Sequence, residues 1–229
     1  MEINDFNVNI ALPPQYGDTV RRFPVVYLMG ETDVEQLMKL LAPHFDSGCK
    51  PFILAGIEGK DWNTPFSPWP APRLGKNLGP FSGGGPRFLL LLEQYIAPAI
   101  DNVYRTVPTP ENRAIAGYSL AGLLALYALY KSKYFSSCAC VSGSLWFPQW
   151  VEYVRTHVPE VKTPRIYISL GDRENESRNS VMATVTDCTQ RTIEALAPYA
   201  PFFEVNTGGH FKDVQQRIVK GLLYIMEAK

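Results

Sequence analysis

The sequence lacks the long apolar run that a membrane-spanning helix requires. No stretch approaches the roughly 18 consecutive apolar residues that cross a bilayer, although 46% of the 229 residues are hydrophobic. The first residues, Met1 to Asp5, contain no basic cluster followed by an apolar core, so we expect no signal peptide. The sequence therefore predicts a cytoplasmic protein that has no membrane partner.

An excess of charge of one sign is also missing. The 22 Lys and Arg residues balance the 22 Asp and Glu residues, and the basic residues form no run or stripe along the chain. Nucleic acids and anionic membrane surfaces bind to basic patches. Neither is an expected partner, and nothing in the composition indicates an oligomeric state.

Cysteine is scarce, with four residues at positions 49, 138, 140 and 188. Cys138 and Cys140 would share one face of a strand, at a separation slightly too large for an easy disulfide. A zinc site needs about four ligands, and no second pair has metal-binding spacing. We therefore expect no metal, and we interpret the cysteines as small buried side chains in a reducing compartment.

Continuous apolar runs alternate with helical patterns along the chain. Phe6, Val8 and Ile10 alternate with polar residues, as in a half-exposed strand near a sheet edge. Buried strands are expected at 23–29, 51–57, 113–118, 136–142, 165–170 and 202–205, and helices at 35–45, 89–104 (kinked at Pro98), 120–130, 148–157, 181–196 and 213–226. This alternation predicts an α/β fold with a mainly parallel central sheet and helices on both faces. Because no stretch resembles a linker, residues 1–229 are expected to form one domain.

The strongest functional motif is the segment Gly117-Tyr118-Ser119-Leu120-Ala121-Gly122, between an expected strand and an expected helix. A serine in such a sharp turn projects its hydroxyl above the sheet, and small neighbours are needed because backbone packs against backbone there. Ala121 occupies a position that is more often glycine, but it is still small. An incidental serine in a tight strand–helix contact is the alternative. The context favours Ser119 as a nucleophile, aided by the partial positive charge of the helix N-terminus.

A serine nucleophile requires a base, and the chain has three histidines. His44 and His157 lie near the ends of expected helices, where we interpret them as ordinary surface or packing residues. His210 follows Gly208-Gly209 between the last expected strand and the last helix. In the α/β-hydrolase fold the base comes from this loop, and the chain order is serine, acid, histidine. His210 is therefore the expected base.

The acid is expected in the loop after the strand at 165–170, which contains Asp172, Glu174 and Glu176. Glu176 is interpreted as solvated, and spacing alone leaves both Asp172 and Glu174 open. The oxyanion hole would combine the backbone N–H of Leu120 with an N–H from the turn at 29–31.

The segment from Asn112 to Gly122 resembles the nucleophile region of the bacterial "putative esterase" family. That family includes trilactone siderophore (enterobactin-type) esterases, feruloyl esterases, S-formylglutathione hydrolases and mycolyl-transferring enzymes. The similarity continues through 26–30, 142–146, 168–174 and 209–211. The resemblance implies an α/β-hydrolase fold, with Ser119 as nucleophile, Glu174 as acid, His210 as base, and the N–H of Glu31 as second oxyanion donor. Met29 departs from the aspartate of many members, and the N-terminal region is shorter than usual, which bears on the substrate more than on the mechanism.

Residues 59–86 form a long connection that is rich in proline, glycine and aromatic residues. Such connections are either disordered or functional, and the aromatic content argues against disorder. We expect Trp62, Phe66 and Trp69 to bind the substrate as an aromatic wall or cover. A loop packed for stability alone is an equal alternative.

Together these features predict a serine carboxylic-ester hydrolase that acts through an acyl-enzyme on a small or medium ester. Its only expected partner is the small-molecule ester, and no metal or organic cofactor is needed. An acyltransferase with the same three residues is one alternative. A catalytically silent binding protein with the same fold is the other.

Overall fold

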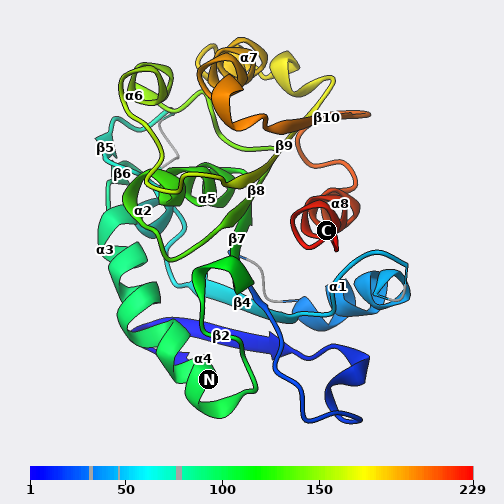
Figure 1. Cartoon of the computed structure of the whole chain (residues 1–229). Coiled ribbons are helices and arrows are strands. Elements are labelled where there is room, and N and C mark those ends of the chain that lie inside the picture. The colour runs from blue at the N-terminus through cyan, green and yellow to red at the C-terminus, as the bar shows by residue number, and fades with distance from the viewer. Residues whose placement is uncertain (31–32, 46, 76–78, 229) are drawn as a thin grey trace.

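The computed structural model describes residues 1–30, 33–45, 47–75 and 79–228. Within these residues the centre of the molecule is an eight-stranded sheet of order β1-β2-β4-β3-β7-β8-β9-β10 (Figure 1). β1 and β2 pair in antiparallel fashion, as do β2 and β4, and the pairs from β4 to β10 are parallel. The strands span Glu2–Ile3 (β1), Phe6–Ala11 (β2), Val25–Met29 (β3), Ile53–Gly59 (β4), Arg113–Tyr118 (β7), Ser137–Val141 (β8), Arg165–Gly171 (β9) and Phe202–Asn206 (β10). The predicted mainly parallel sheet is confirmed.

The continuous apolar runs arise because both faces of the sheet are covered. In β3 every residue is buried. Val25, Tyr27 and Met29 belong to the hydrophobic cluster on one face of the sheet. Val26 and Leu28 belong to the cluster on the other face. A strand that is buried on both sides has no polar face, so its sequence shows no alternation.

The helices divide between the two faces (Figure 1). Helices α1 and α8 contact each other on one face, and α5 packs on β7 and β8 from the other face, with α3, α4 and α6 on the same side. The α-helices span Val34–Leu41 (α1), Gly85–Leu91 (α3), Ala97–Val103 (α4), Leu120–Lys131 (α5), Trp150–Thr156 (α6), Val185–Ala195 (α7) and Val214–Ile225 (α8). Helix α5 is apolar all round because it is buried between the sheet and the surrounding helices.

The helix expected at 89–104 is longer and more interrupted than predicted. It begins at Gly85, with Pro86 in its first turn, where a missing N–H costs nothing. A π-helical turn at Leu92–Ile96 then separates α3 from α4. Pro98 has no backbone N–H, so it cannot donate the helical hydrogen bond to the preceding turn. The α-helical hydrogen-bond pattern is interrupted just before Pro98, and the interruption is the π turn.

The connection at 59–86 contains regular structure that its composition did not predict. Residues Asn63–Phe66 form the short helix α2. Pro70–Ala71 (β5) and Phe81–Ser82 (β6) pair as a small antiparallel sheet. The segment therefore packs onto the domain beside α3 and α5 instead of crossing it as an irregular loop.

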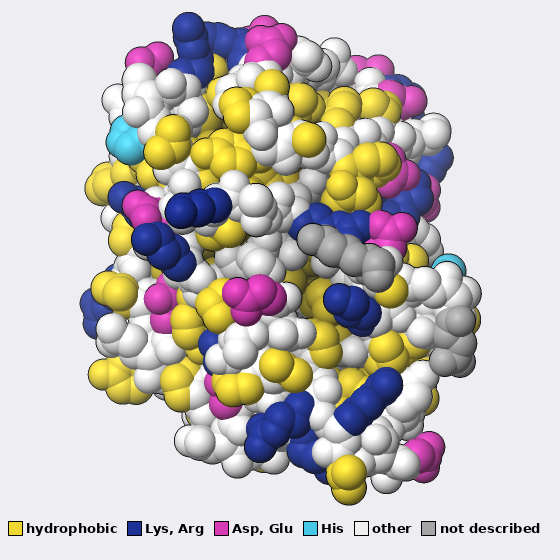
Figure 2. Space-filling model, in the orientation of Figure 1, with side chains coloured by type: hydrophobic (Ala, Val, Ile, Leu, Met, Phe, Trp, Pro, Cys, Tyr) yellow, Lys and Arg dark blue, Asp and Glu magenta, His cyan; other side chains and the backbone are white. Residues whose placement is uncertain are grey.

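The charged side chains on the surface, the cysteines and the lengths of the helices can be compared with what the composition indicated. On the face shown in Figure 2, basic and acidic side chains are interspersed, with hydrophobic groups between them. Cys138 and Cys140 are buried and unpaired in β8. No helix in the described part of the chain is long and apolar enough to cross a membrane.

Candidate active site

Ser119 lies in the sharp turn between β7 and α5. Its φ angle is +59°, which is uncommon for a residue with a side chain and requires support from the surrounding structure. Two backbone hydrogen bonds supply that support: the Ser119 N–H donates to Val141 O, and the Ser144 N–H donates to Ser119 O, both at 3.0 Å. The turn holds the hydroxyl of Ser119 at the carboxyl end of the sheet.

The small residues around Ser119 are required by close backbone contacts. A Cβ atom at Gly117 would collide with the backbone of Ala121, and one at Gly122 would lie 2.9 Å from Gly117 O. Ala121 is itself fully buried, and its methyl group is accommodated. These contacts explain why the motif tolerates alanine at 121 and needs glycine at 117.

Ser119, His210 and Glu174 form a continuous hydrogen-bonded chain. Ser119 Oγ lies 2.9 Å from His210 Nε2, and His210 Nδ1 lies 2.6 Å from Glu174 Oε2. An ionised carboxylate can only accept a hydrogen bond, so Nδ1 carries a proton and its N–H donates a hydrogen bond to Glu174. Nε2 of the neutral ring is then free to accept a hydrogen bond from Ser119 Oγ. This is the tautomer that a general base for Ser119 requires.

Glu174 is buried at the start of the short 3₁₀ helix that follows β9, with 7% of its surface exposed. Burial raises the pKa of its carboxyl group, but the hydrogen bond and charge of His210 and the hydrogen bond from the Gly171 N–H, at 2.7 Å, outweigh burial. The pKa of Glu174 is therefore lowered from its ordinary value. The carboxylate is ionised in the pH range where an imidazole base operates.

Asp172, the other carboxylate that the sequence left open, has a different environment. Its side chain is exposed, and Oδ1 accepts a hydrogen bond from the Gly208 N–H at 2.6 Å. Its own N–H donates to Asn206 O at 2.8 Å. Asp172 thus connects the loop after β9 to the loop that carries His210, whereas Glu174 contacts the imidazole itself.

Ser119 and His210 open onto a cavity of about 560 Å³. Its surface is mostly apolar, and Leu120, the first residue of α5, is part of it. The described residues around the cavity include Leu28, Met29, Gly30, Trp62, Phe81, Ser144, Trp146, Met182, Val185, Phe211, Val214 and Ile218. Glu31, the expected second oxyanion donor, lies outside the described residues. The Gly30 N–H donates to Ile57 O at 2.7 Å and so is already engaged.

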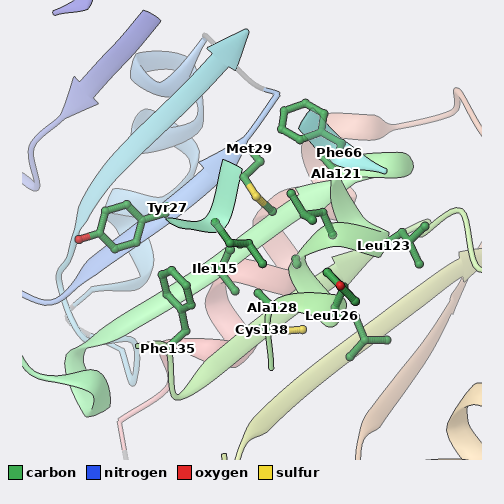
Figure 3. Close-up of a cluster of buried hydrophobic side chains, with 14 of the residues drawn as sticks. Tyr27, Met29, Phe66, Ile115, Ala121, Leu123, Leu126, Ala128, Phe135 and Cys138 are labelled. Carbon is green, nitrogen blue, oxygen red and sulfur yellow. The ribbon is translucent and has the colours of Figure 1, made fainter. Parts of the chain in front are cut away.

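The three aromatic residues expected to bind substrate have different positions. Trp62 borders the cavity and is 42% exposed. Phe66 is buried in the same hydrophobic cluster as Met29 and Ala121, part of which Figure 3 shows. Trp69 packs among Tyr127, Phe147, Trp150 and Tyr153, and its Nε1–H donates to Pro148 O at 3.0 Å. Neither Phe66 nor Trp69 is among the described residues that border this cavity, and the expectation that they bind substrate stays a prediction.

Several residues at the site were not found by sequence reasoning. The Tyr118 hydroxyl donates a hydrogen bond to His210 O. Ser144 Oγ lies 3.3 Å from Ser119 Oγ, and since the Ser119 proton is directed to His210, Ser144 is the donor of this pair. Phe211 borders the cavity with 88% of its surface exposed. Its position beside His210 is the one signal that could have indicated it.

The other histidines are remote from this chain of hydrogen bonds. His157 directly follows the last residue of α6, and its Nδ1 lies 3.0 Å from Tyr153 O. His44 is exposed in a 3₁₀ turn after α1. Among the residues whose structure is described, no group of three or more His, Cys, Asp or Glu side chains could hold a metal ion.

A mainly parallel sheet with a serine turn between β7 and α5, followed in chain order by a carboxylate and a histidine, defines an α/β-hydrolase fold. The sequence model of the "Putative esterase" family matches residues 3–211. The chain belongs to this family, and ester hydrolysis is the activity that membership supports.

Curated relatives share the family sequence at moderate identity. "Uncharacterized protein YbbA" of Bacillus subtilis (strain 168) is 28% identical over 192 residues, which cover 82% of this chain and 76% of the relative. An "Endo-1,4-beta-xylanase/feruloyl esterase" of Xylanibacter ruminicola is 28% identical over 185 residues, covering 73% of this chain and 23% of that protein.

Solved structures share the fold. An IroE-like serine hydrolase from Shewanella oneidensis superimposes with a TM-score of 0.77 at 23% identity, covering 95% of this chain and 74% of that one. Siderophore hydrolase EstA from Aspergillus nidulans superimposes with a TM-score of 0.78 at 17% identity, covering 96% and 89% of the two chains. At these identities the likeness establishes the fold alone.

Proposed function

We propose that the protein is a serine carboxylic-ester hydrolase in which Ser119 is the nucleophile, His210 the general base and Glu174 the acid that orients it. The observation that carries the proposal is the Ser119–His210–Glu174 chain, with distances of 2.9 and 2.6 Å, at the edge of an apolar cavity. Family membership supports the reaction class.

The reaction has two halves. His210 Nε2 removes the Ser119 proton as Oγ attacks the ester carbonyl, and the imidazolium then protonates the leaving alcohol. Water enters and loses a proton to the same nitrogen as it attacks the acyl-enzyme. The imidazolium then returns this proton to Ser119 Oγ as the acyl–Oγ bond breaks and the carboxylic acid product leaves. In both halves the ionised Glu174 stabilises the imidazolium without taking its proton.

The developing oxyanion would be held by the N–H groups of Leu120 and Glu31. Leu120 begins α5 and borders the cavity. Its N–H points along the helix axis towards the N-terminal end, where the helix dipole also favours negative charge.

The cavity favours an uncharged ester of small or medium size. A volume of about 560 Å³ lies within the range of sites that bind small organic molecules, roughly 300–1,000 Å³. Trp62 and Phe211 are aromatic, border the cavity and are partly free of packing partners, so a ligand could cover their exposed surface. One curated relative is named a feruloyl esterase, and one protein of similar fold is named a siderophore hydrolase. Feruloyl and siderophore esters are therefore the first natural substrates to test.

A panel of p-nitrophenyl esters with increasing acyl length tests the proposal. For esters whose deacylation is the slower half-reaction, we expect an initial burst of p-nitrophenol that approaches the enzyme concentration, because acylation releases the alcohol first. Ser119→Ala should remove the burst and nearly all turnover. Absence of hydrolysis by the wild type across p-nitrophenyl, feruloyl and siderophore esters would contradict the proposal. Transfer of the acyl group to an added alcohol faster than to water would replace hydrolysis by acyl transfer.

A further inference from the structure

Arg217, in α8, is a buried cation on the far side of Glu174 from His210. Its exposed fraction is 1%. Nη1 donates to Glu174 Oε1 at 2.9 Å and to Ser142 Oγ at 3.0 Å. Nη2 donates to Thr207 O at 3.2 Å and to Gly209 O at 3.1 Å. One guanidinium therefore contacts the loops that follow β8, β9 and β10.

The two oxygens of Glu174 have separate partners. Oε1 accepts from Arg217 and from the Gly171 N–H, at 2.9 and 2.7 Å. Oε2 faces His210 Nδ1 at 2.6 Å. Two donors on Oε1 fix the plane of the carboxylate, so the remaining oxygen is directed at the imidazole.

Arg217 also fixes the loop that carries His210. The carbonyl groups that it binds, at Thr207 and Gly209, lie just before His210 in the chain. The Tyr118 hydroxyl binds the carbonyl of His210 itself and lies 3.4 Å from Arg217 Nη1. The same guanidinium therefore sets the position of the acid and of the base relative to each other.

The contribution of Arg217 to Glu174 is geometric, because His210 and the Gly171 N–H already favour the ionised carboxylate. A lysine at 217 would keep the charge, but its single nitrogen could not bind the carboxylate and both loop carbonyls with the geometry of a planar fork.

We infer that Arg217 is a positioning residue that holds Glu174 and residues 207–210 in the arrangement required for Ser119 to be activated. This inference rests on the proposed function. At 1% exposure Arg217 cannot touch a substrate in the cavity. Its loss should therefore slow chemistry and leave substrate binding nearly unchanged.

The test compares Arg217→Met with Arg113→Met, because Arg113 is a matched control. Arg113 is also buried, with 6% exposed, and pairs with a carboxylate, that of Asp101. It begins β7, at the opposite end of the strand from Tyr118 and Ser119. Both substitutions remove a buried arginine from an ion pair, so both should lower the melting temperature.

Two rates are measured for each folded variant: kcat on a p-nitrophenyl ester, and the rate of labelling by a fluorophosphonate, which reports Ser119 reactivity without a natural substrate. For Arg217→Met we expect both rates to fall about 10- to 100-fold, the cost of a displacement of about 1 Å at a reacting group. KM should stay within about twofold, as expected when only transition-state stabilisation is lost. Arg113→Met should keep wild-type rates.

Arg217→Lys keeps the inference testable if the methionine variant does not fold. It should melt closer to the wild type, yet label and turn over about tenfold more slowly because the fork is lost. Folded variants at 217 that label at the wild-type rate would overturn the inference, as would an equal loss in Arg113→Met. A wild-type protein that does not react with the fluorophosphonate would instead contradict the proposed function, and this inference with it.

Discussion

Glu174 Oε2 lies 2.6 Å from His210 Nδ1, although the two residues are 36 positions apart in the sequence. The contact forms because β9 and β10 are parallel neighbours. The loops that follow parallel strands meet at the same edge of a sheet, so the loop after β9 brings its carboxylate to the histidine that follows β10.

This contact distinguishes the two carboxylates of the loop. Glu174→Gln should lower kcat by about 10³- to 10⁴-fold with the fold intact, because a neutral amide no longer enforces the tautomer or stabilises the imidazolium. Asp172→Asn should keep kcat within a few-fold and lower stability by about 1 kcal/mol, because a charge-assisted bond to the Gly208 N–H becomes a neutral one. Ester hydrolysis and thermal melts of both variants check this. The reverse pattern would assign the acid to Asp172, and unchanged turnover in both would leave a Ser119–His210 dyad.

The lowered pKa of Glu174 predicts how stability responds to acid. An unfolded glutamate titrates near pH 4.3. Since the folded pKa is lower, ionised Glu174 stabilises the fold above that pH, and the contribution is lost as the pH falls through the folded pKa. The difference in unfolding free energy between the wild type and Glu174→Gln should therefore shrink below about pH 4. Urea melts from pH 7 downwards measure it.

Glu93 is a control for this measurement, because its pKa is shifted in the opposite direction from that of Glu174. Burial raises its pKa, and a hydrogen bond with Ser132 offsets burial only in part. Its ionisation therefore opposes folding, and the stability of the wild type relative to Glu93→Gln should fall as the pH rises through the folded pKa. Parallel pH trends in the two variants would contradict the electrostatic assignment of both groups.

The aromatic residues of 59–86 should separate into two functional groups. Trp62→Ala removes part of the cavity surface, so KM for a p-nitrophenyl ester of an aromatic acid should rise about tenfold with little change in melting temperature. Trp69→Ala leaves a hole among Tyr127, Phe147 and Trp150 and should cost about 3–5 kcal/mol of stability. Its KM, measured below the melting transition, should match the wild type. A raised KM in Trp69→Ala alone would reverse these roles.

The positions of the buried strands along the chain and the position of Ser119 could be predicted because their signals are local. The apolar run at 113–118 became β7 with the same bounds, since a strand buried on both faces shows a continuous run. Small residues at 117 and 122 marked the turn because backbone contacts exclude larger ones. Likewise, the place of His210 followed from chain order in the fold.

The parts that sequence could not predict depend on contacts between distant segments. Arg217 is an ordinary polar residue within an amphipathic pattern, and its contact with Glu174 spans 43 positions. Trp62, Phe66 and Trp69 have similar chemistry, yet the fold of 59–86 places Trp62 at the cavity and the other two in packed surroundings. Composition alone holds no information on that division.

The central claim is that Ser119 is the nucleophile, and covalent labelling tests it most directly. Wild-type protein treated with a fluorophosphonate should gain the mass of one adduct, and peptide mapping should locate it on Ser119, because that hydroxyl lies 2.9 Å from His210 Nε2. Ser119→Ala and His210→Ala should gain none under the same conditions. An unlabelled wild type, or an adduct on Ser142 or Ser144, would contradict the account.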